Sequence, residues 1–328
     1  MRKGFFLLIL YLLSTPLAAF GEVKAKAYYF FLPATNQIIQ AKNQDLPLPP
    51  ASTTKIATAL TSLELYPLDL EVEVRPEAVL VSGTKIYLKP GEKITVKDLI
   101  YGLMLESGND AANALAWVVG KGNFMLILNY YLRQMGLVTA NFKNPSGLSS
   151  PGHEISAKDL SLLTYYALTK KEFANICKTE QYETKSGIKK RIFHNTNRLL
   201  RKDHRVIGVK TGTTSEAGKC LVGAWQGKYF IIGTVLNCPD RFNAMYQTFL
   251  TSDEKFTEKI LLKKGQKIYF KENAWWVLTK DVKILSWKGN QEKIQMIVME
   301  GNAGRRALFY VNGQFLQEQF LQKEKPWR

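Results

Sequence analysis

Cysteine is scarce in this chain of 328 residues, which contains three, at positions 177, 220 and 238. Their odd number and wide spacing argue against a disulfide framework, so we expect three free thiols in the core. Cys220 and Cys238 fall on two neighbouring predicted strands. If those strands meet at a turn over Gln226 and Gly227, Cys238 lies near Ser215 and not opposite Cys220.

Histidine is equally scarce, with His153, His194 and His204 as the three residues of this type. None of them stands in an H-E-x-x-H motif or in a comparable spacing of metal ligands. The sequence therefore argues against a zinc peptidase, and we expect neither a metal nor another cofactor.

The apolar run at residues 5–13 is too short for a membrane-spanning helix, which needs about 20 residues. It follows Arg2 and Lys3 and precedes small residues at positions 18, 19 and 21. This order is typical of a secretory signal peptide, which we expect at residues 1–21, with a retained anchor as the alternative. No cysteine stands near the cleavage site, which excludes a lipoprotein anchor. We expect an exported protein, located in the periplasm or else in the cell wall or at the outer face of the membrane.

Acidic residues are outnumbered, because 45 Lys and Arg stand against 28 Asp and Glu, for a formal net charge of +17. An exported protein of this charge is expected to make peripheral contact with anionic surfaces such as acidic lipid headgroups or cell-wall polymers. Solubility alone is the alternative interpretation. Nucleic acid is not expected as a partner, because the chain is exported and its lysines are scattered.

The pattern of apolar residues predicts two domains after the signal peptide, at residues 22–264 and 265–328. The first alternates strands and helices. Its strands are expected at 28–32, 37–39, 206–212, 220–225 and 229–236, and its helices from residue 52 and over 96–105, 111–119, 124–135, 157–168 and 242–262. The short apolar runs of the second domain are typical of β-strands. Between two of them, Asn312-Gly313 predicts a hairpin turn. The fold class is therefore α/β (α+β) with a small C-terminal all-β domain.

Three short motifs follow one another in the chain: S-x-x-K at Ser52 and Lys55, S-x-N at Ser107 and Asn109, and K-T-G beginning at Lys210. S-x-x-K occurs four times, but only the copy at Ser52 opens a helix of apolar periodicity, one turn before Lys55. Nucleophilic catalysis needs such a hydroxyl beside a base. A lysine acts as a base when burial or a neighbouring cation lowers its pKa, and Lys210 is the candidate for that cation.

The three motifs together are the signature of class A β-lactamases and penicillin-binding proteins. The chain also resembles the serine-type D-Ala-D-Ala carboxypeptidases, the low-molecular-mass penicillin-binding proteins of the S11 peptidase family. The matching segments are residues 49–55, 104–112, 144–148, 152–153, 157–159, 195–199 and 208–218. The resemblance covers residues 25–262 and implies a β-lactamase/transpeptidase-like sheet covered by helices, plus a helical subdomain.

The resemblance further implies a role for each motif residue. Ser52 would attack the carbonyl between the two terminal D-alanines of a peptidoglycan stem peptide, and Lys55 would take its proton. Ser107 would relay a proton to the leaving D-alanine, and Asn109 would hold Lys55 and the substrate amide. Water would then release the acyl-enzyme, and β-lactams would be covalent inhibitors.

The K-T-G strand would bind the terminal carboxylate of the substrate. The residues implied are Lys210, Thr211 and Gly212, with the hydroxyl of Thr213. The backbone N–H groups of Ser52 and Thr213 would form the oxyanion hole. Arg241 is a further candidate for carboxylate binding, with an ordinary surface arginine as the alternative.

Three other functions share these motifs. A class A β-lactamase needs a carboxylate to activate the deacylating water, and Glu154 is the only acid between Pro145 and Ser156; we expect Glu154 to face solvent. A D,D-endopeptidase of peptidoglycan cross-links would keep the same residues. A catalytically silent wall-binding protein would tolerate loss of Ser52 or Lys55, and both are present.

Overall fold

The computed structural model describes residues 6–10, 23–270, 274–287, 294–301, 304–311 and 314–323. The chain divides into two compact units. The larger comprises Glu22–Phe31 and Ile38–Phe249, and the smaller comprises Met1–Gly21, Leu32–Gln37 and Leu250–Arg328. This division falls inside a helix, earlier than the boundary after residue 264 that the sequence predicted.

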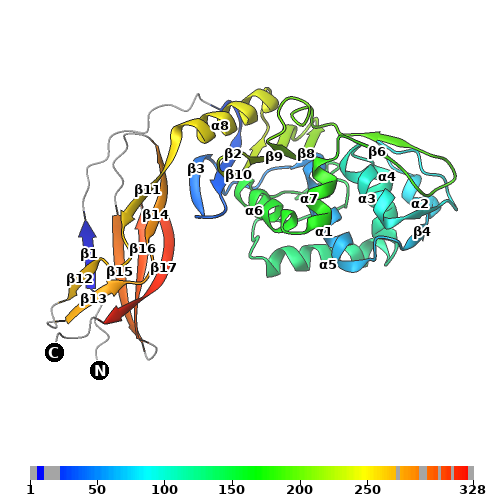
Figure 1. Ribbon diagram of the computed structural model, residues 1–328. Coiled ribbons are helices and arrows are strands. Elements are labelled where there is room, and N and C mark those ends of the chain that lie inside the picture. Colours follow the sequence, from blue (N-terminus) through cyan, green and yellow to red (C-terminus); the bar gives the residue numbers. More distant parts are fainter. Residues whose placement is uncertain are drawn as a thin grey trace. The chain divides into compact units, whose positions relative to one another are not determined.

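The larger unit is built on a five-stranded sheet with the strand order β3-β2-β10-β9-β8 (Figure 1). In this sheet β10 pairs antiparallel with both β2 and β9, and β9 pairs antiparallel with β8. The strands are β2 (Ala27–Leu32), β3 (Gln37–Lys42), β8 (Val206–Thr214), β9 (Gly218–Gln226) and β10 (Phe230–Leu236). All five were predicted, and β8, which carries the K-T-G motif, lies at the edge of the sheet.

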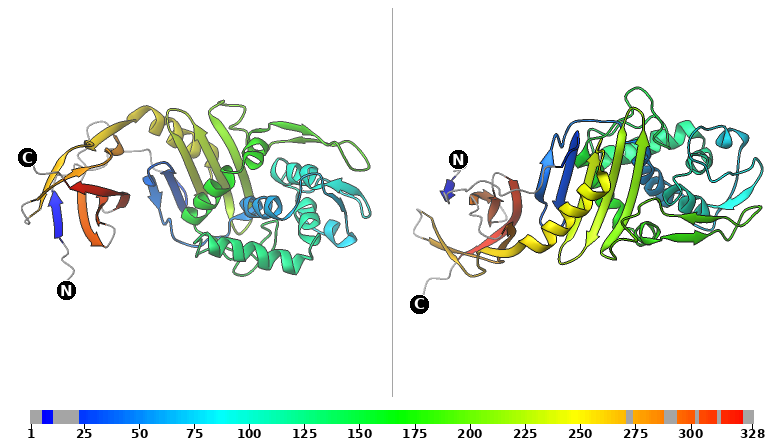
Figure 2. Two further views of the ribbon diagram at one scale, coloured as in Figure 1. Left: turned by 60° about the horizontal axis from the view of Figure 1, so that its bottom comes forward. Right: turned by 90° about the horizontal axis from the view of Figure 1, so that it is seen from above.

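Helices cover both faces of this sheet (Figure 2). Successive residues of a strand point to opposite faces. Phe30 meets Phe249 of α8 (Arg241–Lys255) edge to face, whereas Phe31 meets Tyr165 of α6 (Ala157–Leu168). The expected sheet between two helical layers is therefore confirmed.

The remaining helices of the larger unit form the subdomain beside the sheet and begin with the turn that carries Ser52. They are η1 (Ala51–Thr54), α1 (Lys55–Leu65), α2 (Pro76–Val79), α3 (Val96–Met104), α4 (Asn109–Trp117), α5 (Lys121–Gln134) and α7 (Lys171–Lys178). Two small sheets join β4 (Glu71–Glu73) to β5 (Lys93–Thr95) and β6 (Gln181–Glu183) to β7 (Ile192–His194). Within the described residues no single helix is both long and apolar enough to cross a bilayer, and only the pair α4 and α5, bent by 95°, meets the criterion together.

The smaller unit is rich in strands, as predicted for the C-terminal region. Its larger sheet has the order β1-β15-β16-β17-β13-β12, and β11 pairs with β14. The strands are β1 (Phe6–Leu10), β11 (Phe256–Leu262), β12 (Lys267–Phe270), β13 (Ala274–Leu278), β14 (Val282–Trp287), β15 (Ile294–Gly301), β16 (Gly304–Val311) and β17 (Gln314–Lys323). Asn312-Gly313 lies outside the described residues, between the antiparallel strands β16 and β17. The signal peptide stays a prediction, and its described part is β1.

Two expectations from the sequence are wrong in detail. The helix predicted over residues 242–262 ends at Lys255, because the segment from Phe256 pairs with β14 and that pairing overrides the local periodicity. The strands β9 and β10 meet with Gln226 opposite Phe230, which places Cys238 beside Lys219 and not near Ser215. The three cysteines are buried and free, as expected.

Candidate active site

The first motif lies in the turn that directly precedes α1, and several contacts hold the conformation of this turn. Ser52 belongs to the 3₁₀ turn η1, and the preceding Ala51 has a φ of 50°. The hydroxyl of Thr53 donates to the carbonyl of Pro50 at 2.7 Å. Gly147 packs so closely that a Cβ there would overlap the carbonyl oxygen of Ala51. The backbone around Ser52 is therefore closely confined.

Lys55 is fully buried at the start of α1, and its amine contacts three oxygen atoms. Its Nζ lies 2.9 Å from Oγ of Ser52, 2.7 Å from Oδ1 of Asn109 and 2.6 Å from the carbonyl oxygen of Ser146. The structure thus joins the first and second motifs at a single amine.

Burial lowers the pKa of Lys55 well below its usual value, and the neighbouring charge of Lys210 lowers it further. A neutral amine has two protons and one lone pair. It can donate to Asn109 and to the carbonyl of Ser146 while its lone pair accepts the hydroxyl proton of Ser52. This arrangement is that of a general base on a nucleophile.

The second motif lies between α3 and α4, as predicted. Ser107 is buried, and its backbone has a φ of 66° in the short connection between the two helices. Asn109 opens α4, and its backbone N–H donates to the carbonyl of Thr84 at 2.8 Å, while its side-chain Nδ2 donates to the carbonyl of Ser82 at 2.7 Å. These bonds fix the amide oxygen that faces Lys55.

The third motif places a buried cation on the edge strand. The Nζ atom of Lys210 has no hydrogen-bond partner among the described residues, although the side chain is only 1% exposed. Burial, and after it the charge of Arg241, lowers the pKa of Lys210 from 10.5 to about 7. An ammonium left without a partner at a site is ready to receive an anionic group.

Gly212 brings the edge strand against the nucleophile turn. A Cβ at this position would lie 2.9 Å from the backbone nitrogen of Ser52 and 3.0 Å from that of Thr53. The approach requires a residue without a side chain. It brings the strand that bears Thr213 close to the N–H of Ser52, as an oxyanion hole made by these two residues requires.

Arg241 is tied to the same strand instead of standing free at the surface. Its Nη1 donates to the carbonyl of Gly212 at 2.6 Å, to Oγ1 of Thr213 at 2.8 Å and to the carbonyl of Cys220 at 3.0 Å. The hydroxyls of Thr211, on the same strand, and Thr196 lie 2.8 Å apart. Thr196 was not singled out in the sequence, because its link to Thr211 depends on tertiary structure.

No role was predicted for His153, which stood in a matching segment, and the structure links it to the nucleophile turn. The backbone N–H of Lys143 donates to Nδ1 of His153 at 3.0 Å, which leaves the ring proton on Nε2. Nε2 lies 2.8 Å from Oγ1 of Thr54, whose hydroxyl donates to the carbonyl of Ala51 at 2.9 Å. The chain of bonds ends one residue before Ser52.

Glu154 does not reach the nucleophile. Its backbone is bridged to that of Asn141, and no hydrogen bond joins its side chain to Ser52 or Lys55 in the described part of the chain. The side chain is partly exposed. No cluster of three His, Cys, Asp or Glu side chains suited to a metal occurs among the residues described.

Comparison with known proteins gives a consistent result. A family model described as D-alanyl-D-alanine carboxypeptidase matches residues 14–240. The chain is 31% identical over 278 residues to the D-alanyl-D-alanine carboxypeptidase DacF of Bacillus subtilis (strain 168), covering 78% of this chain and 70% of that protein. It is 33% identical over 275 residues to DacC, of the same description, from Escherichia coli (strain K12), covering 77% and 67%.

Solved structures show the same architecture. The D-alanyl-D-alanine carboxypeptidase DacD from Francisella tularensis superposes with a TM-score of 0.77 at 18% identity, covering 94% of this chain and 95% of that one, which shows the fold. A mutant of the Streptomyces K15 DD-transpeptidase gives a TM-score of 0.66 at 30% identity, covering 70% of this chain and 99% of that one.

Proposed function

The chain belongs to the D-alanyl-D-alanine carboxypeptidase family, the S11 peptidases, and we propose that it removes the terminal D-alanine from peptidoglycan stem pentapeptides. The observation that carries this proposal is the buried amine of Lys55, 2.9 Å from the hydroxyl of Ser52. Because burial lowers the pKa of that amine well below its usual value, we assign Lys55 as the base.

The chemistry proceeds in two steps. Ser52 Oγ forms a bond to the carbonyl carbon between the terminal D-alanines, while its proton passes to Lys55. The carbon–nitrogen bond then breaks, and a proton relayed through Ser107 leaves with the amine of the departing D-alanine. Water attacks the resulting ester, and Ser52 regains its hydroxyl as the shortened peptide departs with a new carboxylate.

The K-T-G strand supplies recognition. The unpartnered ammonium of Lys210 receives the carboxylate of the terminal D-alanine, assisted by the hydroxyls of Thr211 and Thr213. Arg241 holds the hydroxyl of Thr213 and adds positive charge to this end of the site. The N–H groups of Ser52 and Thr213 stabilise the oxyanion, and one such donor typically contributes ~2.7–4 kcal/mol to the transition state.

The proposed location and inhibitors follow from this function. Stem peptides are reached outside the cytoplasm, so we propose an exported protein in the periplasm or at the outer face of the membrane. β-Lactams, which present a strained amide and a carboxylate to the same groups, would acylate Ser52. The net charge of +17 supports peripheral contact with anionic wall polymers or lipids. A D,D-endopeptidase acting on cross-links uses the same residues.

The test is to incubate the purified chain with a fluorescent penicillin and to follow the label for hours. A diacetyl-Lys-D-Ala-D-Ala peptide is assayed in parallel for released D-alanine, and purified cross-linked muropeptides are assayed for cleavage. Durable labelling with D-alanine release supports the proposal. Rapid loss of label with hydrolysed drug and no D-alanine would indicate a β-lactamase, and cleavage of muropeptides alone an endopeptidase. No label at all would indicate the silent wall-binding protein.

A further inference from the structure

The short strand β4 has one backbone edge that no other strand covers in the described part of the chain. In an antiparallel pair, hydrogen-bonded and non-hydrogen-bonded residues alternate. The N–H of Val96 donates to the carbonyl of Leu70 at 2.9 Å, and that of Val74 donates to Glu92 at 2.8 Å. The residues between them, Glu71 and Glu73, therefore direct their backbone N–H and C=O groups away from β5.

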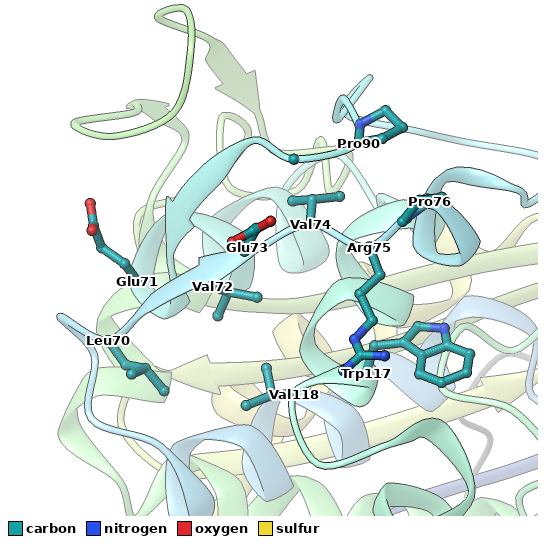
Figure 3. Close-up of a pocket in the computed structure, with 11 residues that line it drawn as sticks. Leu70, Glu71, Val72, Glu73, Val74, Arg75, Pro76, Pro90, Trp117 and Val118 are labelled. Carbon is teal, nitrogen blue, oxygen red and sulfur yellow. The ribbon is translucent and has the colours of Figure 1, made fainter.

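A hollow of about 760 Å³ lies along this strand. Residues 70–76 line it together with Pro90, Gly91, Trp117 and Val118 (Figure 3). Val118 and Leu70 are each 37% exposed, and the guanidinium of Arg75 lies 5.7 Å from the ring centroid of Trp117. The hollow thus offers an apolar wall beside an open strand edge.

The strand itself is acidic, in contrast to the net charge of +17 of the whole chain. Residues 68–77 carry four carboxylates, those of Asp69, Glu71, Glu73 and Glu77, and the cation of Arg75, while Lys93 of β5 stands opposite Glu73. All four acidic residues are exposed. Glu71 and Glu73 stand two residues apart on the solvent side of β4, whereas Val72 between them is buried.

We propose that the open edge of β4 binds an extended peptide segment with basic side chains at alternate positions. Such a segment adds a strand to the edge and pairs with the free backbone groups of Glu71 and Glu73. Side chains two residues apart share one face of a strand, so its cations meet the two carboxylates. The side chains between them point to the other face, where Trp117 and Val118 form the apolar wall.

The probe is a fluorescein-labelled hexapeptide of alternating lysine and valine, titrated with the full chain and followed by fluorescence anisotropy. Glu71→Lys combined with Glu73→Lys should weaken binding about tenfold or more, because two attractions become repulsions. The matched control is Glu172→Lys with Glu180→Lys, which changes the net charge equally at two exposed positions elsewhere. Glu71→Pro should also weaken binding, because it removes an N–H of the open edge and leaves the pairing with β5 intact.

A second peptide separates strand pairing from simple charge attraction. The same hexapeptide with N-methylated backbone amides keeps its cations and loses its donors, and it should bind at least about tenfold more weakly. Equal binding of both peptides, or equal binding by the control and the charge-reversed chain, would overturn the proposal. So would concentration-dependent self-association that the charge reversal abolishes, because a second copy would then occupy the groove. Release of D-alanine is measured in every variant and should not change.

Discussion

Oδ1 of Asn109 accepts a hydrogen bond from Nζ of Lys55 at 2.7 Å, so the amide that ends the second motif faces the amine that ends the first. An amide oxygen orients this amine without adding a negative charge beside it. A carboxylate in the same place would favour the protonated form of Lys55 and raise its pKa. The choice of asparagine therefore keeps Lys55 available as a base.

The Asn109→Asp variant tests this relationship. We expect the acidic limb of the pH profile of β-lactam acylation to move to higher pH by about one unit or more, because Lys55 stays protonated over a wider range. The measurement is the second-order acylation rate between pH 4 and pH 9. Asn109→Ala, which removes the bond and adds no charge, should lower the rate without that upward movement. An acidic limb in the same place for Asn109→Asp would contradict the assignment of Lys55 as the base.

Lys210 should set the alkaline limb for substrates that carry a carboxylate. Its pKa is about 7, so above that pH the ammonium loses its proton and its attraction for the substrate. We expect kcat/KM for diacetyl-Lys-D-Ala-D-Ala to fall as pH rises through about 7, mainly through KM. In Lys210→Arg the cation persists, because arginine keeps its proton, and any remaining activity should show no such fall. A fall at the same pH in this variant would assign the limb to another group.

The same buried cation should lower the stability of the folded chain. The pKa of Lys210 falls from 10.5, the value expected in the unfolded chain, to about 7 on folding. Between these pKa values the unfolded chain binds more protons than the folded chain, so the free energy of unfolding rises with pH across that window. Below pH 7 the destabilisation caused by burying the charged Lys210 reaches its full value. Lys210→Met should therefore stabilise the chain at pH 6 by ~1–4 kcal/mol, and the gain should shrink towards pH 10. Thermal unfolding of both chains at pH 6 and pH 10 measures this gain. Equal stability of Lys210→Met and the unchanged chain at pH 6 would show that other groups offset the cost of burying the cation.

Much of this site could be predicted from the sequence, because its parts are local. Strands β8 to β10 are apolar and separated by turn residues, and the three motifs fall at a helix start, in a connection and on a strand. The register of β9 and β10 could not be predicted, because the turn lies at residues 227–229 and a small shift moves every cross-strand neighbour. The strand Phe256–Leu262 forms because β14 pairs with it, over a long separation in sequence.

Other parts of the site have no signature in the sequence. The carbonyl of Ser146 contacts Lys55, and a backbone oxygen carries no information about its partner. Within the described residues Nζ of Lys210 has no hydrogen-bond partner, and this could be seen only once the chain around its buried side chain was placed. His153 stood in a matching segment, but its action through Thr54 could be seen only once both side chains were placed.

Gly212→Ala should impair acylation through the nucleophile turn. The new Cβ would lie 2.9 Å from the nitrogen of Ser52 and 3.0 Å from the carbonyl of Pro50, both backbone atoms that must move to admit it. We expect the acylation rate to fall by about 100-fold, the cost typical of a reacting group misplaced by about 1 Å. Gly122→Ala is the matched control, because its Cβ would meet nothing within 4 Å. An unchanged rate in Gly212→Ala would mean that the turn and the strand can separate without cost.

His153 should act as a positioning residue, through Thr54 and the carbonyl of Ala51. In His153→Phe the ring remains and the bond to Thr54 is lost, so the acylation rate constant should fall while the dissociation constant of the initial β-lactam complex stays the same. His153→Gln, which can again donate to Thr54, should recover part of the rate. A role in packing alone predicts no recovery by glutamine, since the smaller side chain packs less well.

The pH dependence of stability gives an independent check on His153. Burial lowers its pKa from 6.5 to about 4, so the unfolded chain binds more protons between these values. Stability should therefore fall as pH drops from 6.5 to about 4, by up to ~3 kcal/mol at 1.36 kcal/mol per pKa unit. A proton on Nδ1 would also confront the N–H of Lys143, which donates to that nitrogen in the folded chain. His153→Gln has no such titration, so urea denaturation should show a shallower decline for this variant than for the natural chain. Parallel declines would show that other groups dominate in this range.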